Sequence, residues 1–156
     1  MTIHATFIHI NLIARDWRTL AAFYSEVLGC TPVSPALNLR GDWLERGTGV
    51  AGAGIQGVHL RLPGFGDTGP TLEIFQYDEN VDAPLPTANR IGFRHVAFAV
   101  DDVGAARQAA LFAGGTALGT VESVNIPGTG RVTWTYFRDP EGNIVELQNK
   151  DPEQAV

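Results

Sequence analysis

Two histidines and two glutamates stand at corresponding places in the two halves of this 156-residue sequence. His9 and His95 each lie in an apolar run that opens a half, and Glu73 and Glu146 each lie in an apolar run that closes one. Two imidazoles and two carboxylates suit a divalent transition metal, or zinc with open positions. A lone strand histidine is more often a hydrogen-bonded core residue, and a lone strand glutamate more often lies on a solvated face. Their recurrence as matched pairs favours a metal site over both alternatives.

The neighbours of each glutamate indicate which face of its strand it occupies. In segments 71–75 and 144–148, the residues on either side of Glu73 and Glu146 are aliphatic. Because side chains alternate along a strand, these neighbours are expected to pack on the helices and the glutamates to point into a cavity. An unpaired buried carboxylate costs roughly several kcal/mol or becomes neutral. A shared metal ion would satisfy both glutamates.

An internal repeat relates the two histidines. Segments 7–12 and 93–98 align at an offset of 95 − 9 = 86 positions, and each is followed by an aspartate, a helix of about ten residues and a glycine. The expected helix N-caps are Asp16 and Asp102. The expected left-handed C-terminal caps are Gly29 and Gly114-Gly115.

Strands follow each helix in this pattern. They are predicted at Gly57–Leu62, Thr71–Phe75, Ala117–Val124, Val132–Arg138 and Ile144–Gln148, with one more near Thr31–Leu39. The stretch Arg40–Gly54 is glycine-rich and is interpreted as a loop, and Asp139–Asn143 has the composition of a short hairpin turn.

The predicted fold class is therefore α+β, with two β-α-β-β-β modules related by pseudo-two-fold symmetry around a metal-containing cavity. The whole chain, 1–156, is expected to form one domain, with module 1 at about 5–78, a linker at about 79–91 and module 2 at about 92–149.

Charge and composition restrict the partners. The formal net charge of −6 disfavours nucleic acid and anionic membranes, since both need a basic face. Cys30 is the only cysteine, which excludes an intrachain disulfide and cysteine-based zinc sites. The N-terminus lacks a signal-peptide pattern, and no apolar run approaches the roughly 20 residues that span a bilayer. A cytoplasmic location and a small-molecule substrate are expected.

Two longer motifs show a family resemblance. Segments Arg94–Val103 and Tyr136–Glu146 resemble the vicinal oxygen chelate superfamily, and the resemblance extends from about Phe7 to Gln148. The superfamily includes glyoxalase I, methylmalonyl-CoA epimerase, extradiol dioxygenases, fosfomycin-resistance enzymes and bleomycin-binding proteins. The resemblance implies one divalent ion (Zn, Ni, Co, Mn or Fe, which the sequence does not distinguish) and a homodimer. The ligands implied are His9, Glu73, His95 and Glu146.

The retention of Glu73 selects among the family's activities. Glyoxalase I and the epimerases use four protein ligands, with a carboxylate or amide at this position, so the resemblance favours a lyase or isomerase acting on a small carbonyl or thioester. The metal would stabilise an enediolate or enolate, and Glu146 or Glu73 would be the base.

Further side chains are candidates for the pocket. His59 is a candidate acid–base that could equally be bonded to a neighbouring strand, and family members often have a glutamate at about this position. Arg61 shares its face and would bind a substrate carboxylate or phosphate, unless it is a solvated surface residue. Trp134 and Tyr136 share a strand face and would line the pocket, although aromatic residues at such positions often simply pack.

Two other functions remain open. An extradiol-type ring-cleaving dioxygenase fits the run from Tyr136 to Glu146. That signature also requires a histidine upstream of this run, however, and the sequence has no histidine after His95. A non-catalytic drug-binding resistance protein would hold no tight metal.

Overall fold

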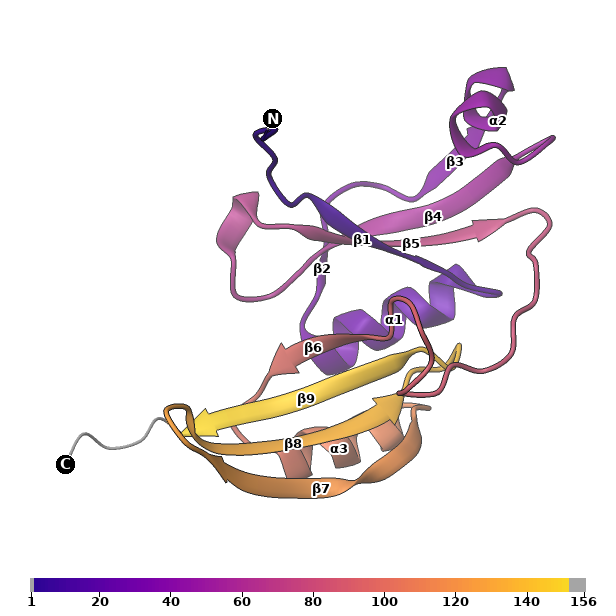
Figure 1. Cartoon of the computed structure of the whole chain (residues 1–156). Helices are drawn as coiled ribbons and strands as arrows, with labels where there is room; N and C mark the ends of the chain where they lie inside the picture. Colours follow the sequence, from indigo (N-terminus) through magenta and orange to yellow (C-terminus); the bar gives the residue numbers. More distant parts are fainter. Residues whose placement is uncertain (1, 152–156) are drawn as a thin grey trace. The chain divides into compact units, whose positions relative to one another are not determined.

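The structure is a computed structural model that describes residues 2–151. The chain divides after Asp82 into two compact units, Met1–Asp82 and Ala83–Val156. Figure 1 labels the elements of both units. Among the described residues, no helix is long and apolar enough to cross a membrane.

Unit 1 contains a sheet in the order β1-β5-β4-β2, with β3 also paired to β4. Strand β1 runs parallel to β5, whereas β4 pairs antiparallel with β5, β2 and β3. The strands are β1 His9–Ile13, β2 Thr31–Pro32, β3 Leu37–Arg40, β4 Gly54–Arg61 and β5 Thr71–Tyr77. The helices are α1 Trp17–Leu28, α2 Asp42–Thr48 and the 3-10 turn η1 Gly66–Thr68.

Unit 2 repeats this topology with a sheet in the order β6-β9-β8-β7. Its first strand, β6, is again parallel to its last strand, β9, and the other pairs are antiparallel. The elements are β6 His95–Ala99, α3 Val103–Phe112, β7 Thr116–Ile126, β8 Gly130–Arg138 and β9 Ile144–Asp151. The predicted α+β class with two similar modules is confirmed.

The predicted N-caps of both helices and the predicted C-cap Gly29 are confirmed, whereas α3 is capped by Ala113, one residue before the predicted Gly114-Gly115. The Asp16 carboxylate accepts hydrogen bonds from the backbone N–H groups of Arg18 and Thr19, and the Asp102 carboxylate accepts one from Ala105. These bonds satisfy donors that the first turn of a helix leaves free. The first helix ends at Gly29, whose φ of 70° is left-handed.

The aliphatic neighbours of both glutamates form the core, as predicted. Leu72, Ile74, Val145 and Leu147 are completely buried. Helix α1 packs on β4 and β5, and α3 packs on β7, β8 and β9 (Figure 1). Each glutamate therefore lies on the sheet face that its helix does not cover.

The interpretation of Arg40–Gly54 as loop is wrong, because this stretch contains α2. Glycines at positions 41, 47 and 49 hid the helix, since glycine has low helix propensity. Leu44 of α2 is 5% exposed and packs in a cluster with Ala53 and Ile55. Burial of this one apolar face outweighs the poor local propensity.

The single strand predicted near Thr31–Leu39 is divided into β2 and β3. Pro32 ends β2, and Pro35 lies between the two strands. Proline has no backbone N–H to give to a ladder, which explains the break.

Candidate functional site

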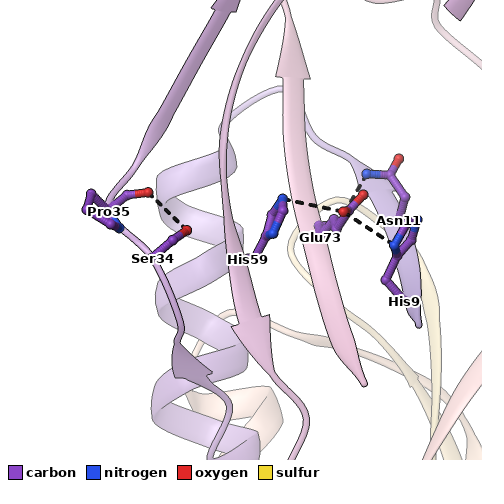
Figure 2. Close-up of polar contacts among 6 residues, drawn as sticks. All are labelled: His9, Asn11, Ser34, Pro35, His59 and Glu73. Carbon is purple, nitrogen blue, oxygen red and sulfur yellow. Dashed lines mark hydrogen bonds and ion pairs between the residues drawn. The ribbon is translucent and has the colours of Figure 1, made fainter. Parts of the chain in front are cut away.

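In unit 1, Glu73 is the third residue of β5 and lies between two histidines on the adjacent strands. Its Oε1 atom is 3.4 Å from Nδ1 of His9 on β1 and 3.4 Å from Nε2 of His59 on β4 (Figure 2). The glutamate side chain is 14% exposed, and the His59 side chain is 32% exposed. Both of these contacts reach the same carboxylate oxygen, Oε1.

The strand register produces this arrangement. Glu73 pairs directly with His59 on β4 and with Asn11 on β1, while His9 lies two residues before Asn11 and so shares its face. The Asn11 side-chain amide donates to the Glu73 backbone carbonyl at 3.5 Å. The His59 ring lies 5.6 Å from the Phe75 ring, centroid to centroid.

In unit 2, Glu146 has a similar but smaller set of neighbours. Its Oε2 atom is 3.0 Å from Nε2 of His95, and its side chain is 16% exposed. The register places Tyr136 of β8 and Ala97 of β6 directly beside Glu146. Glu146 therefore contacts one imidazole where Glu73 contacts two.

Two aromatic side chains extend the Glu146 neighbourhood along β8. The Tyr136 ring lies 5.2 Å from the His95 ring and 5.1 Å from the Trp134 ring, to which it is roughly perpendicular. Burial, and secondarily the Glu146 charge, raise the pKa of the Tyr136 phenol above its ordinary value. The phenol thus keeps its proton at neutral pH and can donate a hydrogen bond.

The registers also identify His59 and Tyr136 as equivalent positions of the two units. His59 is the β4 partner of Glu73, and Tyr136 is the β8 partner of Glu146. The sequence offset that aligns His9 with His95 does not align these two residues, so the sequence alone missed the relation.

Arg61 is engaged in unit 1 itself. Its guanidinium donates to the Gly69 carbonyl at 2.7 Å, which ties the end of β4 to the connection that leads into β5. A role of Arg61 in binding a substrate anion stays a prediction.

Asp139 stabilises the turn between β8 and β9, a role that sequence reasoning missed. Its carboxylate, in a residue only 2% exposed, accepts hydrogen bonds from the backbone N–H groups of Glu141 and Asn143 and from the Asn143 side chain. The turn prediction for 139–143 contained this signal, since aspartate at the start of a turn often accepts from the residues that follow.

The separations within both pairs fit ligands of one divalent ion. Two atoms about 2.1 Å from an ion lie about 3.0 Å apart at a right angle and about 3.4 Å apart at the tetrahedral angle. The measured N···O distances are 3.0 Å for His95–Glu146 and 3.4 Å for His9–Glu73. Within residues 2–151, no three or more His, Cys, Asp or Glu side chains are already gathered as an ion site. The joining of the two pairs on one ion therefore stays a prediction.

Comparison with known proteins yields one family. The family model described as the Glyoxalase/Bleomycin resistance protein/Dioxygenase superfamily matches residues 6–147 of this chain. The YaeR protein of Escherichia coli (strain K12) is 28% identical over 141 residues, which are 89% of this chain and 92% of that protein.

Solved structures show the same fold. A glyoxalase family protein from Bacillus cereus matches with a TM-score of 0.80 at 18% identity, covering 96% of each chain. A mutant of glyoxalase I from Zea mays matches with a TM-score of 0.63 at 19% identity, over 91% of this chain and 45% of that one.

Proposed function

Because the chain belongs to the Glyoxalase/Bleomycin resistance protein/Dioxygenase superfamily, we propose that it is a divalent-metal-dependent lyase or isomerase acting on a small carbonyl or thioester compound. Membership confirms the resemblance inferred from segments 94–103 and 136–146. The superfamily contains enzymes of several reaction classes, glyoxalase I among them, so the choice among them depends on the side chains of this chain.

One observation carries the proposal: each unit pairs a histidine on its first strand with a glutamate on its last. The four side chains that would hold the ion are His9, Glu73, His95 and Glu146. Imidazole and carboxylate ligands suit borderline divalent ions such as zinc, nickel, cobalt, manganese or iron(II). When bound, the ion would polarise a substrate carbonyl and stabilise negative charge on its oxygen.

Glu146 is the better candidate for the base that removes a proton next to that carbonyl. It contacts a single imidazole, whereas Glu73 lies between two. A carboxylate with fewer contacts can turn toward a substrate at a lower cost. The protonated Tyr136 phenol would donate a hydrogen bond to a substrate oxygen, and Trp134 would pack on an apolar substrate group.

The first test measures metal content after purification without an affinity-tag metal. We expect one divalent ion per chain, and loss of it in Glu73→Ala and His95→Ala. Glu79→Ala is the matched control, because Glu79 is an exposed glutamate outside both pairs. A wild-type protein that binds no divalent ion would contradict the proposal and favour a ligand-binding resistance protein.

The second test follows solvent deuterium entering a hemithioacetal or a 2-substituted thioester. Glu146→Gln should keep its ion and lose exchange by about 10²-fold or more, the usual range for a general base. Exchange at the wild-type rate in this variant would exclude Glu146 as the base.

A ring-cleaving dioxygenase is the second candidate, and the run from Tyr136 to Glu146 favours it. If Glu73 stayed with His59, the ion would keep two histidines and one carboxylate, the ligand set of non-haem iron oxygenases. Iron in the purified protein, together with oxygen consumption on a catechol, would favour the dioxygenase over the lyase or isomerase.

We also propose that the chain forms a homodimer, as many members of the superfamily do. A monomer mass in light scattering would contradict this.

A further inference from the structure

His59 and Tyr136 occupy equivalent positions in the two units but differ in their contacts with the neighbouring glutamate. His59 Nε2 is 3.4 Å from the Glu73 carboxylate, in the same distance range as the His9 contact. Tyr136 makes its ring contact with His95 instead, with the ring centroids 5.2 Å apart. An imidazole N–H can donate to a carboxylate and remain in place whether or not an ion is bound.

We infer that His59 is a positioning residue, which holds the Glu73 carboxylate through Oε1 and so fixes its orientation as a metal ligand. This inference rests on the proposed metal-dependent function and replaces the predicted acid–base role of His59. Carboxylate ligands of metal ions are commonly fixed by hydrogen bonds from outside the ligand set. Figure 2 shows His59 and His9 reaching the Glu73 carboxylate from its two sides, one on each neighbouring strand.

Two features make His59 suitable for this task. It is the direct register partner of Glu73, so the β4–β5 ladder fixes the distance between the two residues. Phe75 lies on the same strand and the same face as Glu73, and its ring is beside the His59 imidazole, whose movement it restricts. A partly buried ring held in this way loses little further freedom when it fixes the carboxylate.

The expected consequence is that Glu73 is a preorganised ligand in unit 1, whereas Glu146 in unit 2 is not held in this way. Removing a partner of this kind typically weakens metal binding by about 10- to 100-fold without removing the site. Removing the phenol at the equivalent position should leave ion affinity nearly unchanged, because Tyr136 does not hold Glu146.

The test titrates the full chain with Co²⁺ by calorimetry and by absorption in the visible range. The variants are His59→Phe, which keeps a ring beside Phe75 but loses the donor, and His59→Gln, which restores a donor. Tyr136→Phe is the matched control in unit 2. Thermal unfolding of each variant without metal checks that a lost affinity does not come from a lost fold.

We expect one Co²⁺ per chain throughout, with an unchanged absorption spectrum. His59→Phe should bind about 10- to 100-fold more weakly, His59→Gln should lie between it and wild type, and Tyr136→Phe should stay within about threefold of wild type. A changed spectrum in His59→Phe would overturn the inference by making His59 a ligand. Wild-type affinity in His59→Phe, or equal losses in both phenylalanine variants, would overturn it as well. Absence of Co²⁺ binding by the wild type would overturn the proposed function too, so the two failures are distinguishable.

Discussion

Replacing Asp139 with alanine should loosen the turn that carries Glu146 into the site. Asp139 directly follows β8 and begins the turn to β9, and Glu146 is the third residue of β9. The carboxylate accepts three hydrogen bonds of 2.9–3.0 Å, two from backbone N–H groups and one from the Asn143 amide. Alanine keeps the backbone bonds of the turn but leaves these three donors without their acceptor.

The expected loss follows from these contacts. A hydrogen bond to a charged group contributes about 1.5–3 kcal/mol, so three bonds at the lower end amount to about 4.5 kcal/mol. The donors are only partly buried, and water will replace some of the lost bonds. We therefore expect the free energy of unfolding to fall by about 3–4 kcal/mol in Asp139→Ala.

Asp139→Asn should lose less, about 1–2 kcal/mol, because an amide oxygen still accepts from both backbone donors but without charge assistance. The Asn143 amide would have to rotate to accept from the new side chain. Urea unfolding followed by circular dichroism measures both variants, with Asp67→Ala as an exposed control that should change by less than about 0.5 kcal/mol. A loss below about 1 kcal/mol in Asp139→Ala would refute the account of the turn, since even one charged hydrogen bond exceeds it.

Two other substitutions test buried positions of unit 1. Burial raises the pKa of the Cys30 thiol from 9.0 to about 11. The native thiol should therefore resist disulfide reagents at pH 8, and the free energy of unfolding should fall by up to about 3 kcal/mol as pH rises from about 9 to about 11, where the unfolded chain ionises first. Cys30→Ala should lack this fall, and rapid native labelling would contradict the burial. Gly57→Ala should cost about 1–3 kcal/mol in urea unfolding, since the new Cβ would lie 2.6 Å from Cδ1 of Phe75 and even closer to the Ile74 carbonyl oxygen. Gly47→Ala, with open space around its Cβ, should be neutral or stabilising, and equal losses in both would exclude a steric cause.

Residues with strong local signals were predictable from the sequence. The alternation of residue types around Glu73 and Glu146 identified their core-facing neighbours, because buried apolar residues recur at every second position of a strand with one covered face. Asp16 and Asp102 identified the starts of both long helices. A carboxylate at this position accepts hydrogen bonds from the backbone N–H groups that the first helical turn leaves free.

Features that depend on tertiary contacts were not predictable. Helix α2 was missed because the burial of Leu44, rather than the propensity of its glycine-rich sequence, favours the helix. The contact of Arg61 with the Gly69 carbonyl depends on how the chain returns between β4 and β5. No spacing rule relates these two residues.

The pairing of His59 with Glu73 shows why a repeat detected by one offset gives an incomplete site. From His9 to Glu73 the chain advances 64 residues, but from His95 to Glu146 it advances only 51, because unit 1 carries α2 and a divided strand before β4. The first strands therefore align at one offset and the last strands at another, and only the ladder registers reveal that His59 corresponds to Tyr136. Both units keep the same sheet order, so they keep a histidine beside a glutamate, while the position facing each glutamate is free to differ. An imidazole at one such position and a phenol at the other give the two carboxylates different neighbours, which is the basis for proposing that Glu73 stays fixed and Glu146 moves.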